Sequence, residues 1–130
     1  MREILFRGKT IDNPRWVEGY YAFDGMHLIE RKSIECPRYW EVNPINPNTL
    51  GQFTGLYDKN GVRVFEGDIV HHINELVCED MGQVYWDEKR CQFARTTRGP
   101  YRVSFELSPY ATYEVIGNIF DNPELLEEVK

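Results

Sequence analysis

The sequence predicts an all-β, mainly β-strand protein with a short helix near its C-terminal end. Aromatic residues make up 14% of the chain, with eight Tyr, seven Phe and three Trp, and such residues favour strands. Dipeptides that form tight turns, Asp24-Gly25 and Asn60-Gly61 among them, separate short segments in which apolar and polar residues alternate. Many short strands at this spacing indicate a small barrel or sandwich.

Length and composition are those of one domain, or of one core with a small appendage. The chain has 130 residues, 42% of them hydrophobic, enough for a core that needs no disulfide or metal. It holds no apolar run of about 18 residues, so no membrane span is predicted. The apolar stretch near Met1 is too short for a signal peptide. We therefore expect a cytoplasmic protein without membrane association.

The cysteines and histidines do not indicate a metal or cofactor site. Cys36, Cys78 and Cys91 are an odd number without CxxC spacing, which is typical of reduced thiols in a cytosolic protein. His71 and His72 are adjacent, and adjacent side chains on a strand point to opposite faces. We expect neither a metal nor a cofactor.

The first half of the chain is predicted to form strands up to a proline-rich segment. Strands are expected over 3–7, 16–23 and 27–31, with a turn over 11–15 and a two-residue hairpin turn at Asp24-Gly25. Residues 36–48 contain Pro37, Pro44 and Pro47, which argue against a helix or a central strand. We interpret this segment as a long connection. It divides an N-terminal β portion, 1–48, from a barrel over 49–130.

The second half contains closely spaced strands followed by a helical turn. The expected strands are 51–57, 62–65, 69–73, 82–86, 91–96, 101–107 and 113–119. Asp121 or Asn122 then serves as N-cap, with Pro123 in the first turn of the helix.

A set of glycines, amides and one carboxylate is expected to shape turns. The set is Gly55, Asn60, Gly61, Gly67, Asp68, Gly117 and Asn118. Glycine supplies backbone conformations that tight turns need, and an aspartate can accept hydrogen bonds from nearby N–H groups. A catalytic role for the Asp68 carboxylate is the alternative interpretation.

Three blocks of sequence resemble the YopX family of phage and prophage proteins. The central block runs through Gly51-Gln52-Phe53-Thr54-Gly55-Leu56, Asp58-Lys59-Asn60-Gly61 and Phe65-Glu66-Gly67-Asp68-Ile69-Val70; the outer blocks are 1–7 and 114–126. The three blocks are spread over nearly the whole length of the chain. Residues 72–110, between the central and the last block, carry no matching motif. The resemblance implies an SH3-like, partly open barrel in a protein encoded by a phage or prophage. It brings no activity and no catalytic residues.

A basic stretch lies in the part of the chain that the resemblance does not cover. Its cations are Lys89, Arg90, Arg95, Arg98 and Arg102, and no acidic residue occurs between Lys89 and Glu106. Phe93, Tyr101 and Phe105 are interleaved with them. Cations and exposed rings on a β-barrel face are what single-stranded nucleic acid binds. Alternatively, the rings belong to the core and the arginines pair with nearby acids. The net charge of −6 opposes binding to phosphate backbones.

The chain shows no motif of an enzyme: it lacks a P-loop, GxSxG, HExxH and GxGxxG. We therefore expect a protein that acts by binding, as an oligomeric adaptor or a host-interaction protein, with a second copy of itself or a phage or host protein as partner. Trp16, Tyr20, Tyr21, Tyr39 and Trp40 cannot all be buried in so small a β portion. The alternative function is a single-stranded nucleic-acid-binding accessory protein that uses residues 89–102.

Overall fold

The computed structural model describes residues 3–73, 80–97 and 104–126, and confirms the all-β class. Its described strands form two five-stranded antiparallel sheets. The elements are β1 (Phe6–Thr10), β2 (Trp16–Phe23), β3 (His27–Lys32), β4 (Trp40–Tyr57), β5 (Arg63–Phe65), β6 (Asp68–Ile73), β7 (Asp80–Asp87), β8 (Gln92–Thr96), β9 (Ser104–Glu106), β10 (Thr112–Asn118) and the 3-10 turn η1 (Pro123–Leu126). The expected C-terminal helix is this single turn. The chain divides into two compact units, Met1–Phe53 and Thr54–Lys130, described separately below.

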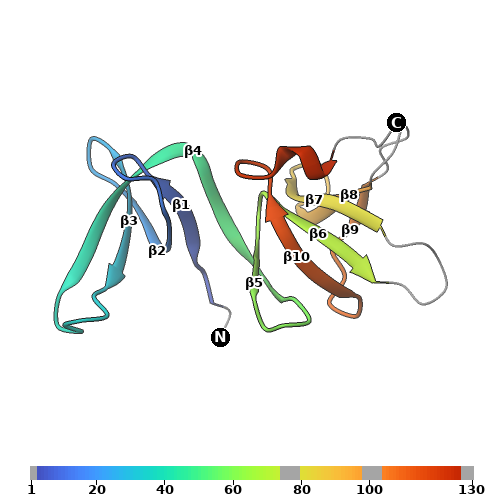
Figure 1. Ribbon diagram of the computed structural model, residues 1–130, viewed down its shortest axis with the longest axis horizontal. Helices are drawn as coiled ribbons and strands as arrows, with labels where there is room; N and C mark the ends of the chain where they lie inside the picture. Colours follow the sequence, from blue (N-terminus) through green and yellow to red (C-terminus); the bar gives the residue numbers. More distant parts are fainter. Residues whose placement is uncertain (1–2, 74–79, 98–103, 127–130) are drawn as a thin grey trace. The chain divides into compact units, whose positions relative to one another are not determined.

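The first four strands of the N-terminal unit close into a ring. Each pairs antiparallel with the next, and β4 returns to pair with β1 (Figure 1). Val17, Ile29 and Ile45 fill the interior. Gly8 lies on the same side, where an added Cβ would sit 2.5 Å from a methyl carbon of Ile45. The barrel was expected over residues 49–130, whereas the ring closed by strand pairing lies in this unit.

The prediction of a connection over 36–48 is wrong from Trp40 onward, because β4 runs through Pro44 and Pro47. The N–H and C=O of a strand residue point to the same edge. The Pro44 carbonyl accepts from Ile11 N at 3.2 Å, so the missing Pro44 N–H faces away from β3 and leaves that ladder intact. Pro47 lies in an irregular stretch of the β1–β4 pairing. The division predicted after residue 48 falls inside β4.

Two local predictions in this unit also differ from the structure. Strand β1 starts at Phe6 rather than Glu3. In the β2–β3 hairpin, Phe23 pairs with His27, so the loop has three residues instead of the two predicted. Gly25 in that loop has a φ of 72°, a left-handed conformation that glycine adopts without steric cost.

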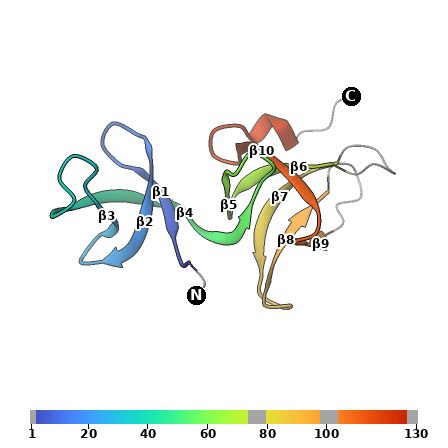
Figure 2. The ribbon, with the colours of Figure 1, turned by 90° about the horizontal axis from the view of Figure 1, so that it is seen from below.

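Among the described residues of the C-terminal unit, five strands form a sheet in the order β10-β6-β7-β8-β9 (Figure 2). Val64 of β5 packs with Val70, Val84 and Tyr113 of this sheet to form the core. Strands β10 and β9 are the outer strands of the sheet. The barrel-like prediction is therefore supported only in part.

The turn between β4 and β5 is anchored on β10 by one buried carboxylate. Asp58 is 7% exposed; its Oδ1 accepts from Asn60 N and Val62 N, at 2.8 and 2.9 Å. Its Oδ2 accepts from Val115 N of β10 at 3.0 Å. Burial alone raises the pKa of Asp58, but the donated N–H groups, with the charge of Lys59, lower this pKa overall below its ordinary value.

Gly55 of the residues expected to shape turns lies within β4, and the others lie in turns, beside a register shift or at strand ends. Asp68 is 1% exposed, and its Oδ2 accepts from Phe65 N at 2.7 Å. The left-handed glycines include Gly55, Gly61 and Gly67, with φ of 92°, 79° and 88°. The β10–β6 register shifts next to Gly117. Asn118 Oδ1 then accepts from Phe120 N and Asp121 N, which turns the chain toward η1.

Candidate interaction surface

Five side chains on the outside of the ring form a surface that we call the outer aromatic face: Tyr20, Glu30, Lys32, Trp40 and Val42. Tyr20 pairs with Glu30 and Glu30 with Val42, while Lys32 pairs with Trp40 in the adjacent row. Directly paired residues point to the same side of a sheet, as do residues two apart in one strand. Tyr20, Trp40 and Val42 are 54%, 49% and 52% exposed. The Tyr20 and Trp40 ring centroids lie 5.9 Å apart.

The interior of the ring explains why these rings lie outside. A Cβ added to Gly19 would be 2.2 Å from the backbone oxygen of Glu30, and the space beside Gly8 is filled by Ile45. Val17, Ile29 and Ile45 fill the inward positions, and the rings of Phe6 and Tyr21 already pack against them. Strict alternation then places Tyr20 and Trp40 on the outer side.

The two charges of the outer aromatic face are unpaired within the described part of the chain. Among those residues, neither the Glu30 nor the Lys32 side chain has a hydrogen bond or an ion pair. Arg31 and Glu41, which point to the other side of the same strands, do form an ion pair at 2.8 Å. Farther along the outside of the ring, the Arg7 guanidinium lies 4.7 Å from the centre of the Trp16 ring, a cation–π distance.

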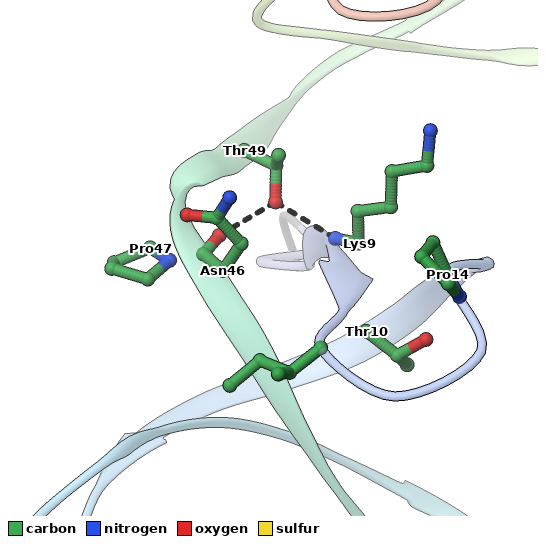
Figure 3. Close-up of a pocket in the computed structure, with 7 residues that line it drawn as sticks. Lys9, Thr10, Pro14, Asn46, Pro47 and Thr49 are labelled. Atoms are coloured by element: carbon green, nitrogen blue, oxygen red, sulfur yellow. Dashed lines mark hydrogen bonds between the residues drawn. The ribbon is translucent and has the colours of Figure 1, made fainter.

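A pocket of about 420 Å³ opens beside the irregular part of the β1–β4 pairing (Figure 3). It is lined by Lys9, Thr10, Ile11, Pro14, Asn46, Pro47 and Thr49. Thr49 Oγ1 accepts from Lys9 N at 2.8 Å and donates to Asn46 O at 2.6 Å. Thr10 Oγ1 is engaged with the backbone of its own turn. These described lining residues include no carboxylate, imidazole or thiol, so the pocket suits an apolar group better than acid–base or nucleophilic chemistry.

The structure separates the members of the basic stretch that it describes. Lys89 and Arg90 are exposed in the turn between β7 and β8. Arg95 is 6% exposed; its guanidinium lies 3.1 Å from His72 Nδ1 and covers the rings of Phe105 and Tyr113. Arg98 and Arg102 lie outside the described residues. Arg95 therefore does not share an exposed surface with Lys89 and Arg90.

Only some residues of the outer aromatic face were predicted from the sequence. Tyr20 and Trp40 were among the aromatic residues expected to be partly exposed, and Tyr39 is also exposed. Trp16 and Tyr21 are half-buried. Val42 was missed because its strand was read as a connection. Glu30 and Lys32 could be placed beside the rings only once the register of β3 with β4 was known.

Metal ligands and membrane spans are not found in the described segments. Within 3–73, 80–97 and 104–126, no three His, Cys, Asp or Glu residues are gathered as a metal site would require. In the same segments, no helix is long and apolar enough to cross a membrane. Cys36 and Cys91 are exposed free thiols, and Cys78 lies outside the described residues.

Comparisons with known proteins identify a family and a similar solved structure. Residues 6–127 match the family model described as YopX protein. The crystal structure of protein EF1440 from Enterococcus faecalis superposes with a TM-score of 0.56 at 24% sequence identity, covering 98% of this chain and 100% of that one. At this identity the likeness shows the fold alone. No curated protein matches the chain.

Proposed function

Because the chain belongs to the YopX protein family, we propose that it is a phage- or prophage-type protein that acts by binding other proteins and not by catalysis. Its role is that of an oligomeric adaptor or a host-interaction protein in the cytoplasm. Its partners are further copies of itself, other phage proteins or host proteins.

The outer aromatic face is the observation that carries this proposal. Tyr and Trp are enriched at the centres of protein interfaces, where large rings contribute much of the binding energy. Tyr20 and Trp40 contact each other while each remains about half exposed. Val42 extends the apolar area, and Glu30 and Lys32 supply polar groups beside it. The two charges lie on the middle strand β3, with Tyr20 on one side of them and Trp40 and Val42 on the other.

Site-specific photo-crosslinking in cells tests the proposal. A benzophenone amino acid at position 42 would lie on the outer aromatic face, and the same group at position 110 provides a control, because Tyr110 is 96% exposed and lies outside this face. We expect one defined protein adduct from position 42, weakened by Y20S and W40S and absent from position 110. The adduct is identified by mass spectrometry. If position 42 gives no adduct, or the same adducts as position 110, the proposal is wrong.

Single-stranded nucleic-acid binding is the second candidate function, supported by the β7–β8 turn. Lys89 and Arg90 are exposed there, next to Trp86, which is 41% exposed and packs edge-on against Phe93 at 5.0 Å. Cations beside an accessible ring can hold a phosphate and stack a base. The burial of Arg95 and the net charge of −6 make this candidate the weaker one.

A further inference from the structure

We infer that the occupant of the outer aromatic face is the same face of a second copy of this chain, related by a two-fold axis that sets the two β3 strands antiparallel. This inference rests on the proposed function and names the partner of the same surface.

Charge complementarity is the first argument. Glu30 and Lys32 lie two residues apart on β3 and point to the same outer side. When two such faces meet with their β3 strands antiparallel, Glu30 of each copy lies opposite Lys32 of the partner subunit. A parallel arrangement would instead place Glu30 against Glu30 and Lys32 against Lys32. Both charges lack an ion-pair partner among the described residues. Each can therefore form an ion pair with a second chain.

The apolar side chains obey the same symmetry. Val42 lies in the row of Glu30, and Trp40 lies in the row of Lys32. The rotation that brings Glu30 onto the partner's Lys32 therefore also brings Val42 onto the partner's Trp40. An isologous interface requires this reciprocity, in which residue i meets j and j meets i. The pairs Glu30 with Lys32 and Val42 with Trp40 satisfy it.

Within the N-terminal unit, the closed ring leaves little strand edge for association; the edge strands β9 and β10 belong to the other sheet. In β1 to β4, each strand has hydrogen-bonded neighbours on both sides over part of its length. A second chain could not readily add a strand to such a ring, because closure removes the unpaired edges that strand addition needs. Side chains on the outside of the ring are then the means of contact.

Charge exchange at positions 30 and 32 tests the inference on the full-length chain. Wild-type protein is expected to sediment as a dimer. E30K or K32E alone places like charges together twice in each dimer and should weaken dimerisation at least about tenfold. An equimolar mixture of E30K and K32E should form a heterodimer, because every facing pair is then Lys with Glu. The double variant E30K/K32E should regain the homodimer. E35K, which makes the same charge change at an exposed loop position, should remain dimeric.

Analytical ultracentrifugation with one variant fluorescently labelled gives each mass, and far-UV circular dichroism verifies that each variant is folded. A monomeric wild type, an oligomer of odd order, dimers indifferent to E30K and K32E, or no heterodimer on mixing would each overturn the inference. A monomer that still gives one defined adduct with a different protein from position 42 would refute self-association while leaving the proposed binding function in place.

Discussion

Replacing Asp58 with alanine should destabilise the C-terminal unit by about 2–4 kcal/mol. The substitution removes the acceptor for three backbone donors, those of Asn60, Val62 and Val115. A hydrogen bond to a charged group contributes about 1.5–3 kcal/mol. Asn60 and Val62 are exposed, so water can replace the carboxylate there at little cost. The N–H of Val115 is in a partly buried part of β10, so the loss of its acceptor accounts for most of the expected effect.

The contribution of Asp58 also depends on pH. Its pKa is lowered in the folded chain, since N–H donation outweighs the effect of burial, which raises the pKa. A lowered pKa means that the stabilisation is fully present above the unfolded value of about 4 and is lost as the pH falls through the folded value. The difference in unfolding free energy between wild type and D58A should therefore be constant near neutral pH and shrink below about pH 4.

Urea unfolding and amide hydrogen exchange at Val115 measure this effect, with D87A as the matched control. Asp87 Oδ1 also accepts from two backbone N–H groups of its own turn, at 3.1 and 3.2 Å, but in an exposed setting. We expect D87A to cost less than about 1 kcal/mol. If D58A lowers the free energy of unfolding no more than D87A does, the carboxylate does not anchor the turn on β10. The same conclusion follows if amide hydrogen exchange at Val115 is unchanged.

Three further outcomes are expected. G82A should destabilise the protein by about 3 kcal/mol or more, because an added Cβ would lie 1.6 Å from a backbone oxygen of β8; an unchanged thermal midpoint would contradict this. D68A should lower the unfolding free energy by about 2 kcal/mol, since it removes the acceptor of the buried Phe65 N–H, and a wild-type urea midpoint would argue against its turn-forming role. Chromatography with light scattering should show no effect of a single-stranded oligonucleotide; a salt-sensitive shift, lost in K89A/R90A, would instead favour the second candidate function.

Local signals predicted local structure well. The bounds of β2, Trp16–Phe23, agree with the sequence to the residue, because alternation and a following turn are properties of neighbouring residues. The turn at 58–61 and the strand after Gly67 were found for the same reason. The error at 36–48 has a non-local cause. Whether a proline interrupts a strand depends on which neighbour its missing N–H would face, and this requires the strand pairing.

The outer aromatic face could be predicted only in part, also because it depends on strand pairing. Tyr20 and Trp40 could be named from composition, but their contact across β3 depends on two registers at once. Arg95 was grouped with other cations by proximity in the sequence. In the structure, however, Arg95 is buried and its guanidinium lies over Phe105 and Tyr113. A guanidinium can occupy such a site because its planar cation stacks on aromatic faces.

The return of β4 to β1 has a consequence for how the chain acquires its structure during synthesis. Phe6 pairs with Gln52, so the ring cannot close until both have left the ribosome. At about 5–20 residues per second, β1 waits roughly 2 to 9 s for its second neighbour. During that interval the β1–β2 hairpin still has an open edge. Completion of the N-terminal unit is thus a long-range event of high contact order, which topology makes slow relative to hairpin formation.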